Sequence, residues 1–204
     1  HIPMPSPLLS RIPVTKRKPD NRIVWVTTID SKYNHLILNT IFGNRHHKYF
    51  EHQSKLYKKL NKEIRELTHI RLYNDYDFGW NCEKRWYQID KNVKIADKRE
   101  HFINQIRNAK LVIVDHFGGT TYIEALHLDI PTILIGNKDL FSHRDEANSI
   151  FSEMLDNDLF ITDVKVGADL INTTFHNIDD WWNNKRRRKT INRFKRNYAK
   201  SDKN

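Results

Sequence analysis

The sequence predicts an α/β fold in which a Rossmann-like parallel sheet is flanked by helices. Two observations support this. Leu111–Val114 and Thr132–Ile135 are short, continuous apolar runs, as expected for parallel strands that are covered on both faces. Between these runs lie a Gly118-Gly119 turn, an amphipathic helical stretch and Pro131, which together make a β-α-β unit. Strands also alternate with helices elsewhere, which favours a parallel sheet with helices on both sides.

The other elements follow from the same patterns in chain order. We expect further strands at 23–28, 70–73 and 159–161. We expect helices at about 47–67, 98–108, 143–155, 164–174 and 179–200, and an aromatic, charged loop at 74–88. Residues 1–21 hold most of the six prolines and are interpreted as a linker or surface arm. The domain prediction is therefore a nucleotide-binding unit at 22–178, followed at 179–204 by a long basic helix that packs back on it or on a hinge.

Composition narrows the class of protein. A chain of 204 residues with 38% hydrophobic and 29% charged residues and a mean hydropathy of −0.74 is typical of a folded, soluble domain. No run approaches the length of a membrane span. Cys82 is the only cysteine, which excludes an internal disulfide and fits a reducing cytoplasm. The net charge of +10 indicates an acidic partner such as nucleic acid, an anionic membrane or a phosphorylated ligand.

The glycine turn is the main candidate binding site. Gly118 and Gly119 allow a sharp turn at the end of a strand, and Thr120 and Thr121 follow where a helix begins. Helix N-terminal amides and threonine hydroxyls together suit a phosphate. The alternative is an ordinary helix cap, because Thr121 and Glu124 match the Thr-x-x-Glu capping box.

Four further residues beside this turn have two interpretations each. Glu124 is placed to bind a ribose diol or to fold back on the N-cap amide. His116 is a candidate donor to a phosphate or carboxylate, or a half-exposed structural residue, and Asp115 is interpreted as structural. Arg144 follows the strand at 132–135 and suits the carboxylate or phosphate of a charged donor, unless it is an ordinary surface arginine.

Other clusters of residues are more typical of a structural role than of a binding or catalytic role. The aromatic loop contains Asp75, Asp77, Trp80, Arg85 and Trp86. These residues suit stacking on a base or a sugar, but the favoured interpretation is that they pin the loop to the body of the domain. The eleven histidines form no convincing metal-ligand pair and no ATP-type P-loop occurs, so we expect neither a metal nor another cofactor. The basic residues of 185–200 suit an anionic membrane surface or nucleic acid, or else a solvated helix face.

Several stretches together resemble the C-terminal half of a family of transferases encoded in bacterial O-antigen and surface-carbohydrate gene clusters, which look like GT-B glycosyltransferases. The matching stretches are VWVTT (24–28), RLYNDYDFGW (71–80), LVIVDHFGGTTYIEAL (111–126), PTILI (131–135), DDWW (179–182) and RFKRNYAKS (193–201). The double-threonine turn and the acidic segment Ile29-Asp30-Ser31 depart from what the resemblance leads us to expect. A more distant resemblance is to retaining β-Kdo transferases, which use CMP-Kdo.

The resemblance implies a glycosyltransferase that takes a nucleotide-sugar donor, uses no metal and extends a glycan or lipid-linked glycan acceptor. It also implies an acceptor-binding N-terminal domain outside this chain, and a cytoplasmic protein with peripheral contact to the inner membrane. Asp30 and His116 are the implied catalytic candidates, and Gly118, Gly119, Thr120, Thr121, Glu124 and Arg144 are the candidates for donor binding. The alternatives are a CDP-alcohol polyol-phosphate transferase and a basic nucleic-acid-binding module; under the favoured interpretation nucleic acid is not a partner.

Overall fold

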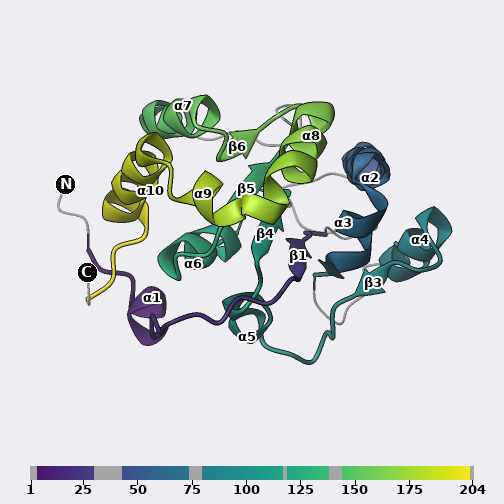
Figure 1. The fold of residues 1–204 in the computed structure, drawn as a ribbon, viewed down its shortest axis with the longest axis horizontal. Coiled ribbons are helices and arrows are strands. Elements are labelled where there is room, and N and C mark those ends of the chain that lie inside the picture. The colour runs from purple at the N-terminus through teal and green to yellow at the C-terminus, as the bar shows by residue number, and fades with distance from the viewer. Residues whose placement is uncertain (1–3, 30–42, 74–79, 117–118, 138–143, 203–204) are drawn as a thin grey trace.

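A computed structural model describes residues 4–29, 43–73, 80–116, 119–137 and 144–202 of the chain. Its centre is a sheet of six parallel strands in the order β3-β2-β1-β4-β5-β6 (Figure 1). The strands are β1 (Ile23–Val26), β2 (Thr68–Arg71), β3 (Lys94–Ile95), β4 (Leu111–Val114), β5 (Thr132–Ile135) and β6 (Phe160–Ile161). The α/β, Rossmann-like prediction is confirmed.

The strand order contains a switch point between β1 and β4. From β1 the chain proceeds outward to β2 and β3, whereas from β4 it proceeds in the opposite direction to β5 and β6. The two central strands pair in register, with Ile23 opposite Leu111 and Val26 opposite Val114. Every residue of β1, β4 and β5 is buried, which explains why these strands are apolar without alternation. Their carboxyl ends therefore meet at one edge, where open α/β sheets bind ligands.

Helices cover both faces of the sheet. On one side α8 packs against α2, and on the other α10 packs against α6 and α7 while α5 contacts α6. The helices are α1 (Pro7–Arg11), α2 (Gly43–Lys59), α3 (Lys62–Leu67), α4 (Cys82–Ile89), α5 (Phe102–Arg107), α6 (Thr121–His127), α7 (Asn148–Asp156), α8 (Val164–Thr174), α9 (Ile178–Trp182) and α10 (Lys185–Tyr198), with single turns η1 (Asp145–Ala147) and η2 (Phe175–Asn177).

Part of the N-terminal segment packs closely on the body of the domain. Leu9 and Ile12 are buried in the main hydrophobic core. The Arg17 guanidinium donates to the backbone carbonyls of Arg107 and Asp129 at 3.1 and 3.3 Å, and also to that of Ala109. These bonds fix the segment beside the loops that precede β4 and β5. These contacts thus hold residues 4–21, predicted as a linker or an arm over the surface, against the domain, while most of the residues in the segment are exposed.

The basic C-terminal region is two helices rather than the single long helix expected from the sequence. The chain leaves α9 at Trp182 and restarts at Lys185. Asn184 explains the restart, because its side-chain oxygen accepts from the backbone N–H groups of Arg186 and Arg187 at 3.0 and 3.5 Å. On α10, Arg187, Arg188 and Arg193 pair with carboxylates of the body. These three ion pairs therefore hold the helix against the domain.

Two further elements differ from the expectation. The segment interpreted as a loop at 74–88 contains α4 in its second half, and Asn81, with φ of 52°, turns the chain into that helix. The short strand β3 follows it and pairs with β2. The helix expected at 47–67 is divided into α2 and α3 at Leu60 and Asn61. The sheet prediction was more accurate because buried parallel strands have a stronger apolar signal than short, partly exposed helices.

Candidate functional site

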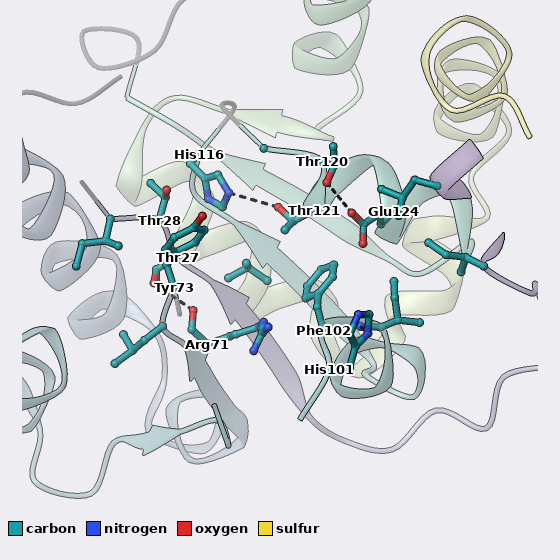
Figure 2. Close-up of a pocket in the computed structure, with 17 residues that line it drawn as sticks. Thr27, Thr28, Arg71, Tyr73, His101, Phe102, His116, Thr120, Thr121 and Glu124 are labelled. Atoms are coloured by element: carbon teal, nitrogen blue, oxygen red, sulfur yellow. Dashed lines mark hydrogen bonds between the residues drawn. The ribbon is translucent and has the colours of Figure 1, made fainter. Parts of the chain in front are cut away.

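The switch point carries a cavity of about 720 Å³ at the carboxyl ends of β1, β2 and β4 (Figure 2). One side is formed by the strand ends, a second by the start of α6, and the rest by α5 and the N-terminal segment. The polar residues that line it are Thr27, Thr28, Arg71, Tyr73, His101, His116, Thr120, Thr121 and Glu124. The volume is within the range of small-molecule sites, and the position is that of ligands in open α/β folds.

The turn after β4 brings the backbone very close to an imidazole. A Cβ built on Gly119 would lie 3.2 Å from Nε2 of His116, so even an alanine would press on the ring. Glycine at this position therefore has a packing reason in addition to its conformational freedom. Gly118, the other glycine of the predicted site, lies outside the described residues.

The first turn of α6 faces the cavity with its hydroxyls. Thr120 is the N-cap residue, but its side chain makes no capping bond. Instead, its hydroxyl donates to Oε1 of Glu124 at 2.6 Å. The capping box considered for Thr121 and Glu124 is therefore not formed, since the helix starts at Thr121 and the carboxylate points to Thr120. The first N–H groups of any α-helix lack intrahelical acceptors, so this turn can still offer donors to an anion.

His116 is held between a carboxylate and a hydroxyl. Its ring is buried, with Nδ1 3.5 Å from Oδ1 of Asp115 and Nε2 3.4 Å from the hydroxyl oxygen of Thr121. Nδ1 makes no hydrogen bond within the described residues, and in the tautomer with the proton on Nε2 that nitrogen is a donor toward Thr121 and the cavity. Figure 2 shows the ring directed at Thr121. The arrangement presents one oriented imidazole nitrogen to a ligand.

Asp115 is a buried carboxylate with three side-chain donors. Its oxygens accept from Nε1 of Trp25 at 2.7 Å, the hydroxyl of Tyr49 at 2.5 Å and Nε2 of Gln53 at 2.7 Å. The structural interpretation of Asp115 fits this geometry, because so many donors stabilise a buried charge. Burial, followed by the charge of Asp115 and the bond to it, raises the pKa of Tyr49 well above its ordinary value.

The Asp115 network also fixes the end of β1. The backbone N–H of Thr28 donates to the hydroxyl of Tyr49 at 2.8 Å, so this hydroxyl joins the loop after β1 to the carboxylate after β4. Sequence reasoning missed Tyr49 and Gln53. The sequence does contain a signal that could have found these two residues. They are four positions apart and share a helix face with the apolar Leu60. Polar groups on such a buried face need hydrogen-bond partners.

The family model described as LIC12162 family transferase matches residues 1–204, the whole chain. The chain belongs to this family. No curated protein matches the chain. The resemblance to a transferase family is thereby confirmed at the level of transferase chemistry, and the protein is an enzyme of that class.

In this LIC12162 family transferase one predicted site residue, Arg144, does not line the described cavity, and another lies outside the described residues. Arg144 is exposed at the start of η1 and does not line the cavity, so its role as a donor ligand stays a prediction. Asp30, the proposed carboxylate nucleophile, lies outside the described residues. Within the described ranges, no three His, Cys, Asp or Glu side chains come together as a metal site. None of the described helices is long and apolar enough to cross a membrane.

The aromatic loop residues serve packing in the transferase. Trp86 lies in the core with its ring edge-on to Trp25 at a centroid distance of 5.5 Å. The Trp80 ring stacks on His46 at 4.1 Å, and its carbonyl accepts from Nε of Arg85 at 2.8 Å. None of these side chains lines the cavity. Their packing agrees with the structural interpretation, and Asp75 and Asp77 of the same loop lie outside the described residues.

Proposed function

We propose that this transferase is a glycosyltransferase that holds a nucleotide-sugar donor in the cavity between the ends of β1 and β4. The supporting observation is the placement, in a transferase, of Thr120, Thr121 and His116 around one cavity at the sheet's switch point. A transferase needs a place where the leaving group is bound before and after transfer. Hydroxyl, imidazole and helix N-terminal donors at one point suit a phosphate leaving group.

Each group around the turn has a proposed role. As the bond between the sugar carbon and the phosphate oxygen breaks, negative charge grows on the phosphate, and donors from the first turn of α6 stabilise it. His116 would hydrogen-bond the phosphate or the sugar through Nε2. Asp115 and its three donors keep that nitrogen directed at the cavity.

Donor binding would change the contact between Thr120 and Glu124. In the structure the Thr120 hydroxyl donates to Glu124 at 2.6 Å. A phosphate at the turn would compete for that hydroxyl, which releases the Glu124 carboxylate to accept from the two hydroxyls of a ribose. Thr120 and Glu124 would each gain a hydrogen bond to the ligand and would lose only the bond between them. Donor binding would therefore cost little hydrogen bonding within the protein.

The finer assignment rests on the resemblance described from the sequence. We favour a GT-B arrangement, a cytidine nucleotide as donor, and Kdo from CMP-Kdo as the transferred sugar, with Asp30 as the carboxylate that forms the covalent intermediate. The acceptor would be a growing bacterial surface polysaccharide or O-antigen, bound partly by a second domain. The exposed basic residues of α10 would then lie near an anionic membrane that carries a lipid-linked acceptor.

A thermal-shift panel of CMP, CDP, UDP, GDP and the matching nucleotide sugars tests donor binding. One nucleotide present at one hundred times its dissociation constant should stabilise the fold by about 2.7 kcal/mol. Thr120→Val with Thr121→Val should abolish that shift, because both hydroxyls are lost while helix and packing remain. Thr173→Val is the control, since Thr173 is an exposed helical threonine on α8, away from the cavity.

Two results would overturn the proposal. One is the absence of a shift with every nucleotide in the panel. The other is a double variant that binds the nucleotide as tightly as the parent, since the turn would then not be the phosphate site. Binding of mixed oligonucleotides that weakens steeply with salt would favour the nucleic-acid alternative instead.

A further inference from the structure

An arginine at the carboxyl end of β2 lines the cavity and has no carboxylate partner among the described residues. The half-buried Arg71 donates through Nη1 to Oε1 of Gln105 at 3.1 Å, and its guanidinium carbon lies 5.5 Å from the centre of the Phe102 ring. Burial lowers the pKa of Arg71, while the charge of Glu100 acts in the opposite direction. Within the described residues no carboxylate pairs with this cation: a neutral amide and an aromatic ring are its side-chain contacts, and Glu100 acts on it only through its charge.

Some arginines of the described chain that are half-buried or more have counter-ions, whereas Arg17 and Arg65 bond only to carbonyls. Arg187 pairs with Asp158 at 3.2 Å and Arg188 with Asp129 at 2.6 Å. Within the described residues Arg71 makes no such pair, although it lies in a cavity where an anion has room. Among the described residues Arg71 is therefore a half-buried cation with no ion-pair partner, at a position where a ligand can reach it.

We propose that Arg71 forms a second anion subsite, separate from the threonine turn, for a further negatively charged group of the ligand. The inference rests on the proposed function and deepens it. Figure 2 shows Arg71 and Phe102 on one side of the cavity and Thr120 and Thr121 on the other. A planar guanidinium suits bidentate recognition of a carboxylate or a phosphate.

The neighbours of Arg71 define how the subsite would work. Gln105 fixes the guanidinium from one edge, and the bond from its own Nε2 to the carbonyl of Asp97 orients its amide. Phe102 covers one face. Glu124 lines the same cavity and repels anions, so a second anionic group is expected nearer to Arg71. Two sources of this group fit: a carboxylate on the transferred sugar, or the second phosphate of a nucleoside diphosphate.

The first test uses inorganic anions and needs no nucleotide. Melting temperatures of the parent and Arg71→Gln are compared in millimolar sulfate against chloride at equal ionic strength. Sulfate should raise the melting temperature of the parent more than that of Arg71→Gln. Arg65→Gln is the matched control, because Arg65 also lies over an aromatic ring, Tyr57 at 5.9 Å, and bonds only to carbonyls, but does not line the cavity. An equal sulfate effect in the parent and Arg71→Gln would overturn the subsite.

The second test distinguishes the two sources. Calorimetry of CMP, CDP and CMP-N-acetylneuraminate is performed on the parent, Arg71→Gln and Arg71→Lys. A carboxylate subsite predicts a loss of about tenfold or more in Arg71→Gln for the acidic nucleotide sugar alone. A second-phosphate subsite predicts that loss for CDP alone. Arg71→Lys should lose part of the affinity, since the charge remains without the planar fork.

The outcomes separate this inference from the proposed function. If CDP and CMP-N-acetylneuraminate both bind the parent and Arg71→Gln equally, or if CMP weakens as much as the others, the subsite is wrong and donor binding stands. If sulfate acts through Arg71 but no nucleotide binds, the subsite stands and the donor site is wrong. Circular dichroism of each variant establishes that it has folded.

Discussion

The hydroxyl of Tyr49 donates to Oδ1 of Asp115 at 2.5 Å while it accepts from the backbone N–H of Thr28 at 2.8 Å. One oxygen atom on α2 thus connects the loops that follow the two central strands. Since both loops border the cavity through Thr28 and His116, the contact fixes the relative positions of its two sides. The Tyr49 hydroxyl therefore gives the cavity a rigid boundary.

Removing the Tyr49 hydroxyl should destabilise the fold. Tyr49→Phe leaves the buried Asp115 carboxylate with one donor fewer and the Thr28 N–H without its acceptor. We expect the free energy of unfolding to fall by about 1–3 kcal/mol, measured by urea denaturation. Tyr198→Phe is the control, because Tyr198 is 42% exposed, and its effect should be within about 0.5 kcal/mol. Equal stability of the two variants would show that the Tyr49 bridge contributes little.

Gly119→Ala should weaken nucleotide binding with little effect on stability. The new Cβ would lie 3.2 Å from Nε2 of His116 and push the imidazole away from Thr121. Calorimetry should therefore show a lower affinity. In Gly167→Ala the added Cβ would instead meet Cδ1 of Ile135 at 3.1 Å. That variant changes core packing, so an affinity loss of the same size there would argue against a specific effect of the His116 ring.

Acidification should destabilise the protein through His46. Burial, with the charge of Arg85, lowers the pKa of this histidine to about 4, from 6.5. Between these two values the unfolded chain binds a proton that the folded chain rejects. The contribution is therefore present above about pH 6.5 and is lost as the pH falls toward 4, with a loss of about 2 kcal/mol between pH 7 and pH 5.

His46→Phe tests this histidine because phenylalanine retains a ring against Trp80 and cannot be protonated. Unfolding free energies at pH 7 and pH 5 should differ less in this variant than in the parent. Part of the pH dependence of the unfolding free energy should remain in this variant, since burial also lowers the pKa values of His52, His69 and His127. His47→Gln serves as the control on an exposed neighbour. An unchanged pH dependence in His46→Phe would exclude His46 as its source.

The sheet and its turn were the most predictable parts from sequence. The uninterrupted apolar runs of β4 and β5 are typical of covered strands, and the Gly118-Gly119 turn between them marked the edge where the candidate site lies. The helix break at Asn184 was not predicted, because the basic and apolar residues on both sides continue the helical spacing. Only the side-chain capping bond at Asn184 shows that the chain restarts there.

The parts of the site that depend on long-range contacts could not be predicted. Tyr49 and Gln53 are more than sixty residues from Asp115 in sequence, and only the packing of α2 on the sheet brings them to it. Arg71 belongs to one of the stretches that carry the family resemblance, but nothing in the local sequence indicates that it lacks an ion pair with the described carboxylates. The Thr120 to Glu124 bond likewise depends on which threonine starts α6, and the sequence allows either.

Amide chemical shifts of the labelled protein, followed during titration with CMP and CDP, test the central claim most directly. Donor binding at the switch point predicts the largest shifts for the N–H groups of Gly119, Thr120 and Thr121, together with the side-chain nitrogens of His116. Shifts confined to the basic residues of α10, with the turn after β4 unaffected, would contradict the assignment of the donor site.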